Sequence, residues 1–582
     1  MPFSSTTNVD TPITNTNTKT FTTNTATGDT DTEPQTQPWK YATRITCTIP
    51  SGRSSTSSLL STSTTTAASM RVTRPTASLR FGPLQVFAEA TVLDPDAAVG
   101  VAGGKGATRG GESSSSSRDD LSTSSTSNNS AAYFPWPVLD AVLCKMVIVV
   151  PCKDEKLSVI RGVLAAIPVG CAVILVSNCQ RTDDDDEYAQ QAAMALAFAS
   201  PGRPVMTVHQ KDPIAAAALR AAGMADLCED KAVSGDTPTP ETIRDGKGEG
   251  MILGIALAAA FCPGRKYIGF VDADNFCAAS VTEYCKDFAT GFALDEERDV
   301  EEKEEKEETM VRLRWASKPK VRNGMVEFVP EGRCSRIVNS WLNRLFSLDG
   351  GSGSGRDGAT ETPAQSGFIT TGNAGEHAMT MGLALKLRLA SGYAIEPFHF
   401  VDLLERAQMT GRNTTNISTK QQTPSSSSTA SSSVPGIKPL TKPVRILQLR
   451  TRSPHYHRAS PEAHIRRMWA VGLGCIYHGL ASATAFLRQE PETDHPITVD
   501  ADDAGGLNDA GNNPNTHNTN ISHLLREMHN FAKDGGAVEA ETGALPRPRV
   551  YPALEGMDGR KFREGMLGRK GRAGGTLRMA GV

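Results

Sequence analysis

Short apolar runs rich in β-branched residues alternate with stretches of helical periodicity between residues 145 and 275, and this alternation restricts the fold more than any other feature of the chain. The runs expected to form strands are KMVIVVP (145–151), CAVILVS (171–177) and PVMTVH (204–209). The stretches expected to form helices are 155–167, 187–199 and 249–262. Such alternation predicts an α/β fold in which a mostly parallel sheet carries helices on its faces.

The next apolar run, KYIGFVDADN (266–275), ends in two carboxylates, Asp272 and Asp274. Ligands of open α/β sheets bind at the carboxyl ends of the strands, so both side chains are expected where chemistry would occur. Residues at i and i+2 of an extended segment project to one side, where two carboxylates can hold Mg²⁺ or Mn²⁺. Such an ion could bridge the diphosphate of a sugar nucleotide and neutralise the leaving group. The alternative is a strand-terminating turn that includes Asn275.

A second motif, IRDGKGEGM (243–251), precedes an expected helix. Its three glycines would let backbone N–H groups approach an anion, Lys247 supplies a positive charge, and the start of the helix adds a positive dipole end. A diphosphate would fit such a loop. The spacing is not that of a Walker loop, and the alternative is a glycine-rich turn that only begins a helix.

A third motif is TRSPHYHRAS, which contains His455 and His457. Histidines at i and i+2 of an extended segment project the same way, and a neutral imidazole is a common metal ligand beside carboxylates. Two surface histidines in a loop are the alternative.

Composition separates this part of the chain from the rest. Residues 1–135 are dominated by Ser, Thr, Asn and Gly and are predicted to be disordered, because they contain too little apolar material to offset the entropy of ordering. One catalytic domain is expected over 136–566, followed by a flexible basic tail at 567–582. Similar polar stretches within that domain are interpreted as surface-loop insertions near 294–309, 347–366, 407–440 and 491–520.

Charge and cysteine content exclude several classes of protein. A net charge of −3 without a basic face argues against nucleic acid as a partner. Eleven cysteines without metal-ligand spacing favour reduced thiols in a cytoplasmic protein, and the best apolar run, 251–262, is too short to span a bilayer, so no membrane partner is expected. An alternative location is an organelle, because residues 41–81 are Arg-, Ser- and Thr-rich without acids, although this segment does not start at the N-terminus.

Longer motifs follow one another along the chain: VVPCKDE (149–155), VSNCQR (176–181), VHQKDP (208–213), RDGKGEGM (244–251), YIGFVDADN (267–275), MVRLRWASKPKV (310–321), TTGNAGEHAM (370–379), SGYAIEP (391–397), QLRTRSPHYH (448–457) and PRVYPALEGMD (548–558). In content and order they resemble the blocks of the mannosyl-3-phosphoglycerate synthase family. The resemblance covers about 143–480 and 521–566.

The resemblance implies a GT-A type, Rossmann-like glycosyltransferase that moves mannose from GDP-mannose to 3-phosphoglycerate with retention of configuration and with a divalent metal, Mg²⁺ or Mn²⁺. It assigns the nucleotide to Pro151, Glu155, Ser177, Asn178, Arg181, Gln210, Lys211, Asp212 and Lys247. It assigns the metal to Asp272, Asp274 and His455. It assigns the sugar and acceptor to the loop that holds Gly372, Asn373, Ala374, Glu376 and His377. The expected catalytic residues are Asp272, Asp274, Lys247 and Glu376.

Other roles remain open for several of these residues. Glu155 and Glu376 could cap the helices that follow them. The cations Arg312, Arg314, Lys318 and Lys320 suit an acceptor with a phosphate and a carboxylate, but they could also form a solvated strand edge. Two departures from the family pattern, Arg336 and Arg450, replace expected acids and leave the proposed ligands intact, although an acid at 450 would support a histidine ligand.

Three alternative functions also remain open. One is a related retaining synthase that uses UDP-glucose or a glycerate acceptor. Another is a silent, nucleotide-binding scaffold, against which the intact ligand residues argue. A nucleotidylyltransferase normally has a glycine-rich loop after its first strand, and VPCKDE has none. The phosphorylated product suggests a downstream phosphatase. The sequence does not determine the oligomeric state, and a homodimer is one assembly that it allows.

Overall fold

A computed structural model describes residues 69–93, 131–180, 186–229, 241–275, 277–302, 307–322, 325–349, 367–415, 437–456, 460–487, 514–567 and 575–581. The three expected strands are present as β6 (Met146–Cys152), β7 (Ala172–Ser177) and β8 (Val205–His209). The three expected helices are α2 (Leu157–Ala166), α3 (Glu187–Leu196) and α5 (Lys247–Phe261). The predicted α/β alternation is confirmed.

The centre of the sheet consists of the parallel strands β8, β7, β6 and β9 (Tyr267–Phe270), in that order. Both faces of this centre are covered, because Val147 and Val149 pack in one hydrophobic cluster while Met146, Ile148 and Val150 pack in another. Successive side chains of a strand point to opposite faces, so a strand buried on both sides reads as an unbroken apolar run. This burial explains the sequence KMVIVVP.

The described residues extend this centre to a 13-stranded sheet. Next to β9 the order continues through β13 (His377–Thr380), β10 (Glu308–Arg314) and β15 (Val444–Arg450). Beyond these lie β1 (Met70–Val72), β2 (Ser78–Phe81), β3 (Leu84–Phe87), β4 (Ala90–Leu93) and β5 (Ala132–Phe134). Two small sheets pair β11 (Lys318–Arg322) with β12 (Met325–Val329) and β14 (Leu389–Ala390) with β16 (Val550–Tyr551).

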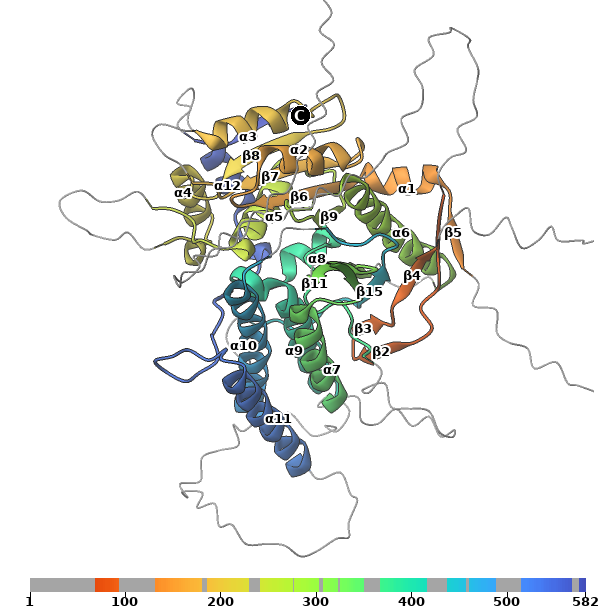
Figure 1. Ribbon diagram of the computed structural model, residues 1–582, viewed down its shortest axis with the longest axis vertical. Helices are drawn as coiled ribbons and strands as arrows, with labels where there is room; N and C mark the ends of the chain where they lie inside the picture. The colour runs from red at the N-terminus through yellow and green to blue at the C-terminus, as the bar shows by residue number, and fades with distance from the viewer. Residues whose placement is uncertain are drawn as a thin grey trace, which may run out of the picture. The chain divides into compact units, whose positions relative to one another are not determined.

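Helices cover both faces of the sheet (Figure 1). Buried residues of α1 (Trp136–Leu143), α2, α3 and α6 (Ala278–Glu302) share one hydrophobic cluster. The opposite cluster contains buried residues of α4 (Pro213–Ala221), α5, α7 (Arg333–Asp349), α8 (Met381–Lys386), α9 (Ile395–Thr415), α10 (Glu462–Leu487), α11 (Pro514–Asp534) and α12 (Gly559–Leu567). Short 3₁₀ turns are η2 (Ala225–Leu227), η3 (Gly392–Ala394) and η4 (Leu554–Gly556).

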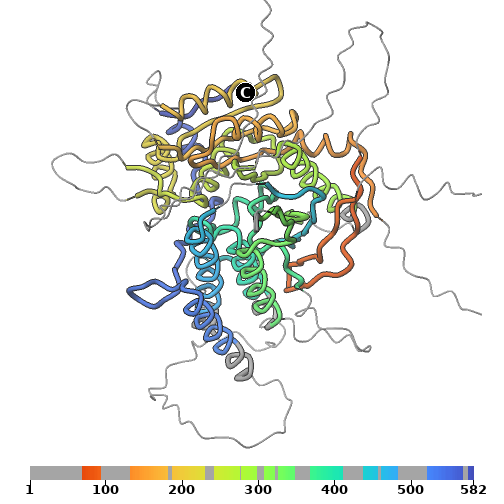
Figure 2. The backbone as a smooth tube through the Cα atoms, in the orientation of Figure 1, coloured from red at the N-terminus to blue at the C-terminus, as the bar shows by residue number. Residues whose placement is uncertain are grey.

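The expectation that residues 1–135 are disordered is wrong for its described part. Strands β3 and β4 pair in parallel with β15, more than 350 residues further along the chain, and β1 joins β4 and β5. Figure 2 shows this N-terminal part, in red, beside the later strands of the sheet. Strands of three or four residues within a polar sequence carry little local signal, so only the long-range pairing reveals them. Residues 1–68 and 94–130 lie outside the described part.

The expected tail at 567–582 also differs from the structure, because β17 (Arg578–Ala580) pairs antiparallel with β8 and adds an edge strand. The expected acidic loop at 294–309 is largely ordered, since α6 continues to Glu302 and β10 begins at Glu308. Asp295 is buried there and pairs with Arg445 of β15 at 3.0 Å. A buried partner that is distant in sequence turns an apparent surface acid into part of the core.

The other expected insertions begin or end in helices. The insertion at 347–366 begins inside α7, the one at 407–440 begins inside α9, and the one at 491–520 ends inside α11. Their remaining residues lie largely outside the described part. Within the described residues, every helix is too short or too polar to cross a membrane.

Candidate active site

The carboxyl end of β9 carries the two predicted aspartates. Asp272 and Asp274 are partly exposed, whereas Ala273 between them is buried. Strand β13 runs antiparallel to β9 with His377 opposite Phe270, so Glu376 enters the same region from the neighbouring strand. A Cβ atom at Gly375 would lie 2.5 Å from Asp272 Oδ2, so a larger residue there would displace the Asp272 carboxylate.

Lys247, the first residue of α5, joins the aspartates to a third element. Its Nζ atom lies 2.7 Å from Asp272 Oδ1 and 2.9 Å from Glu396 Oε1, at the start of α9. Burial would lower the pKa of Lys247, but the charges of Asp272 and Glu396 outweigh burial and raise it well above its ordinary value. Lys247 therefore stays cationic between two carboxylates.

The glycine-rich loop before Lys247 has a packing role of its own. Gly246 has φ of +149°, and a Cβ at Gly248 would lie 2.3 Å from the carbonyl oxygen of Ala390. Gln210 donates to the carbonyl oxygens of Arg244 at 2.8 Å and Gly246 at 3.0 Å. The loop therefore leads directly into α5, as expected, and its expected contact with a diphosphate stays a prediction.

Glu376 is fully buried beside this cluster. Its Oε2 atom accepts a hydrogen bond from Trp315 Nε1 at 2.9 Å, while its Oε1 atom has no hydrogen-bond partner among the described residues. Burial, followed by the negative charge of Asp272, raises the pKa of Glu376 to about 8.

His455 lies on the other side of Glu376. Its Nδ1 atom is 3.8 Å from Glu376 Oε1 and 3.1 Å from the Tyr284 hydroxyl, and its ring stacks on Trp315 with centroids 3.7 Å apart. The structure thus brings His455 to the carboxylate cluster, whereas His457 lies outside the described residues. Within the described part of the chain, no three His, Cys, Asp or Glu side chains are arranged to hold a metal ion. The expected ligand set is therefore near the site but not preassembled.

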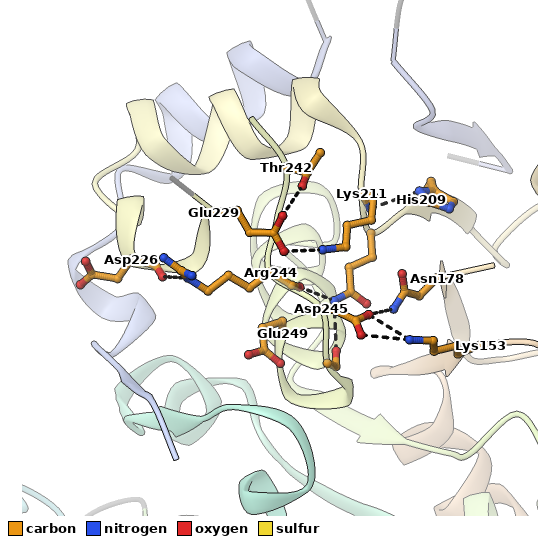
Figure 3. Close-up of polar contacts among 12 residues, drawn as sticks. Lys153, Asn178, His209, Lys211, Asp226, Glu229, Thr242, Arg244, Asp245 and Glu249 are labelled. Carbon is orange, nitrogen blue, oxygen red and sulfur yellow. Dashed lines mark hydrogen bonds and ion pairs between the residues drawn. The ribbon is translucent and has the colours of Figure 1, made fainter. Parts of the chain in front are cut away.

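Several residues assigned to the nucleotide lie at the carboxyl ends of β6, β7 and β8. Asn178 Nδ2 donates to Asp245 Oδ1 at 2.5 Å, and Lys153 pairs with the same carboxylate at 3.0 Å (Figure 3). Lys211 Nζ pairs with Glu229 at 2.7 Å. Pro151 and Glu155 are half-buried beside these ends. Arg181 lies outside the described residues.

Two of the residues assigned to the nucleotide form hydrogen bonds within the protein. Asp212 is buried, caps α4 through the Ile214 N–H, and accepts hydrogen bonds from the Thr576 N–H and hydroxyl, both at 2.6 Å. The buried Ser177 hydroxyl donates to Gln191 Oε1 at 2.7 Å. These side chains stabilise helices and the C-terminal segment, which the sequence could not reveal because Thr576 lies 364 residues beyond Asp212.

Hydrogen bonds within the protein fix the loop that precedes β13. The Gly372 N–H donates to Asn339 Oδ1 at 2.7 Å, and His377 Nδ1 contacts the carbonyl oxygens of Ala374 and Gly375 at 3.2 and 3.1 Å. His377 and Ala374 are buried, while Asn373 is partly exposed. Among these residues, Asn373 is the most available for a ligand.

The four expected acceptor cations separate into two groups. Arg312 is fully buried and donates to the carbonyl oxygens of Thr371 and Glu396, and Arg314 pairs with Glu89 at 3.0 Å. Lys318 Nζ instead lies 5.1 Å from the centroid of the Trp315 ring. Burial, followed by the charge of Lys320, lowers the pKa of Lys318 to about 8. Lys318 and Lys320 are the cations left for an acceptor.

Sequence reasoning missed Glu396, Trp315 and Tyr284. Glu396 and Trp315 stand inside the motifs SGYAIEP and MVRLRWASKPKV, so the motifs contained the signal. The expectations assigned no residue of the first motif and only the basic residues of the second. Tyr284 lies on α6 outside every motif, and only the fold brings it to His455. The structure assigns Arg336 and Arg450 no role at this site.

Comparison with known proteins bears on what this site does. The family described as mannosyl-3-phosphoglycerate synthase matches residues 74–566. The synthase of that name from Pyrococcus furiosus is 35% identical over 348 residues, covering 60% of this chain and 75% of its own. The one from Aeropyrum pernix is 28% identical over 346 residues, covering 58% and 74%.

Among solved structures, glucosyl-3-phosphoglycerate synthase from Mycobacterium tuberculosis with phosphoglyceric acid is similar at 16% identity and a TM-score of 0.33, covering 59% of this chain and 82% of its own. A TM-score of this size is too low to relate individual site residues of the two chains.

Proposed function

The chain belongs to the mannosyl-3-phosphoglycerate synthase family, and we propose that it transfers mannose from GDP-mannose to 3-phosphoglycerate, with retention of configuration, at the carboxyl end of β9. The observation that carries this proposal is the arrangement around Lys247, whose Nζ lies within 2.9 Å of Asp272 and Glu396. A lysine held between carboxylates can stabilise the negative charge that develops on a departing diphosphate while its own position stays fixed.

A divalent cation fits the donor set on chemical grounds. Asp272, Asp274 and Glu376 provide carboxylate oxygens, which Mg²⁺ and Mn²⁺ prefer, and His455 provides an imidazole. Glu376 Oε1 is buried without a hydrogen-bond partner among the described residues, which is the kind of group that a cation satisfies. Asp272, Asp274 and His455 would hold the ion. When bound, it would stabilise the charge that develops on the departing GDP.

The remaining residues bind and orient the two substrates. Asn178, Lys153 and Asp245 form a hydrogen-bonded group that would border the guanosine end, and Gln210 fixes the loop that leads to Lys247. A hydrogen bond from Trp315 would hold Glu376 in one orientation beside the sugar. Trp315 also stacks on His455, which fixes the position of both rings beside Glu376.

Lys318 would bind the acceptor phosphate. It lies over Trp315 and close enough to Asp274 and Glu376 for their charges to act on it. A site that matches a phosphate with a partly buried cation leaves that cation unpaired when free glycerate is offered. 3-Phosphoglycerate is therefore the expected acceptor, and glycerate is expected to be used poorly.

The experiment is an incubation of purified protein with GDP-mannose and 3-phosphoglycerate, with and without Mg²⁺ or Mn²⁺, followed by mass spectrometry. Product is expected only with metal. Comparable turnover with UDP-glucose or with glycerate would instead identify a related synthase. Binding of GDP-mannose without turnover on any acceptor would favour the scaffold alternative.

The cellular location and the oligomeric state of the protein are proposed as well. We propose a cytoplasmic enzyme whose phosphorylated product is used by a phosphatase, and a homodimer as its assembly. Cell fractionation with an antibody tests the location, and light scattering of the purified protein tests the assembly.

A further inference from the structure

The beginning of helix α6 contacts the chain segment 452–455, which ends in His455. Three buried side chains of the helix make these contacts: Ser280, Glu283 and Tyr284. They stand at i, i+3 and i+4, a spacing that places side chains on one face of a helix. One face of α6 is therefore dedicated to holding this segment.

Glu283 holds the backbone of the segment. Its Oε1 atom accepts a hydrogen bond from the Arg452 N–H at 2.6 Å, and its Oε2 atom accepts one from the Ser453 N–H at 3.1 Å. The Glu283 side chain is buried, so these charge-assisted hydrogen bonds lie in a medium of low dielectric constant, where they are strong. The Ser280 hydroxyl adds a hydrogen bond to the Pro454 carbonyl oxygen at 3.2 Å. One carboxylate and one hydroxyl thus fix three successive residues of the segment.

Tyr284 contacts the imidazole ring of His455 itself. Its hydroxyl lies 3.1 Å from His455 Nδ1 and accepts a hydrogen bond from Asn275 Nδ2 at 3.4 Å. Asn275 and Tyr284 are both buried, and Asn275 directly follows Asp274 in the chain. Two hydrogen bonds therefore connect the strand end that carries the aspartates to the histidine.

The contact with Tyr284 does what the other contacts of His455 cannot do. The His455 N–H donates to the Ser317 carbonyl oxygen at 2.9 Å, which fixes the backbone, and the Trp315 ring sets the plane of the imidazole through stacking at an interplanar angle of 5°. A half-turn of the imidazole about its Cβ–Cγ bond would keep that plane and exchange Nδ1 with a ring carbon. A hydroxyl beside Nδ1 favours one of these two orientations, because a ring carbon cannot replace the hydrogen bond.

We propose that Glu283 and Tyr284 are positioning residues, which set the place and the orientation of the His455 imidazole relative to the strand-end aspartates. The inference rests on the proposed function, in which the aspartates and His455 hold a divalent ion. Both residues act through His455, and neither is expected to touch the metal or a substrate. Removal of a side chain that orients a metal ligand typically lowers metal affinity or activity about 10–100-fold.

Titration of the purified protein with Mn²⁺ in the presence of GDP, with the free ion measured by electron paramagnetic resonance, tests the proposal. A protein-free blank corrects for the Mn²⁺ that GDP holds. Tyr284→Phe removes only a hydroxyl, and Glu283→Gln replaces one acceptor oxygen by a donor; each should weaken Mn²⁺ binding about tenfold or more. The matched control is Tyr267→Phe, which removes another buried tyrosine hydroxyl, one that donates to Glu296 further along α6 at 2.6 Å. It should bind Mn²⁺ as the wild type does.

Two further measurements separate a positioning role from a loss of stability. Turnover by Tyr284→Phe should need more Mn²⁺ for its half-maximal rate and should approach the wild-type kcat at saturating Mn²⁺, whereas a loosened fold would lower kcat at every Mn²⁺ concentration. His455→Ala should weaken Mn²⁺ binding, and Tyr284→Phe added to it should cause no further loss, because both changes remove the same contact. Thermal melts check that each variant folds, and Tyr284→Phe carries the test if Glu283→Gln does not fold.

Wild-type Mn²⁺ affinity in Tyr284→Phe would overturn the inference for the imidazole ring, and the same result in Glu283→Gln would overturn it for the backbone segment. An equal loss of affinity in Tyr267→Phe, or additive losses from Tyr284→Phe and His455→Ala, would also overturn it. These results would leave the proposed metal ligands intact. If His455→Ala itself bound Mn²⁺ as the wild type does, the ligand set of the proposed function would be wrong, and the inference would fail with it.

Discussion

Asp212→Ala should destabilise the fold and leave donor binding unchanged, although the sequence placed Asp212 under the nucleotide. The carboxylate is 1% exposed and accepts hydrogen bonds from the Ile214 N–H at 2.8 Å and from the Thr576 N–H and hydroxyl at 2.6 Å. Removing it leaves two buried donors of Thr576 and the partly buried Ile214 N–H unmatched. It also releases the segment that leads to β17.

The expected magnitude follows from these contacts. A hydrogen bond to a charged group contributes about 1.5–3 kcal/mol, and loss of a helix N-cap costs about 1 kcal/mol. These contributions overlap, because relaxation and water can satisfy some of the donors. The free energy of unfolding should therefore fall by about 3–5 kcal/mol, as expected when one partner is removed from a buried network.

Urea unfolding followed by circular dichroism gives this free energy, and steady-state kinetics give KM for GDP-mannose. The matched control is Asp186→Ala, which removes an exposed N-cap that accepts from the Ala189 N–H at 3.0 Å and should cost about 1 kcal/mol. Thr576→Val should be destabilising and non-additive with Asp212→Ala, because both remove the same contact. Equal losses for the two aspartate variants would refute the structural role, and a large rise in KM at unchanged stability would restore the nucleotide role.

Three further predictions concern the site and the N-terminal strands. Asp274→Ala should lower kcat at least about a hundredfold without changing the melting temperature. His455→Ala should also lower kcat. If Asp274→Ala kept near-normal, metal-dependent turnover, Asp274 would have no part in the mechanism. Because the pKa of Lys318 is about 8, its charge is lost as pH rises through that value, so KM for 3-phosphoglycerate should increase above pH 8 in the wild type but not in Lys318→Arg. Deletion of residues 1–135 removes β1–β5 and should abolish cooperative unfolding, whereas deletion of 1–68 keeps these strands and serves as the control.

Much of the central fold could be predicted from local sequence. The runs at 145–151, 171–177 and 204–209 are mostly apolar because their strands are buried on both faces, and such a pattern depends on neighbouring residues alone. The placement of Asp272 and Asp274 at a strand end followed from the same pattern and from the general position of ligands in α/β sheets.

The rest depended on contacts between distant segments. The short strands β3 and β4 pair with β15, and β17 pairs with β8, in each case with a segment far away in the sequence. Runs of three or four residues within polar surroundings therefore read as loops. Partners far along the chain also decided the roles of Asp212 and Asp295, which meet Thr576 and Arg445 only in the folded protein.

The sequence by itself determined the α/β alternation, the strand-end aspartates and the motifs of the family, because each is written in neighbouring residues. Only the tertiary structure decided which charged side chains lie next to one another. Lys247 meets Glu396, and Glu376 lies beside His455. The physical reason is that charge pairing and burial depend on distances in space, and segments far apart in the sequence set those distances.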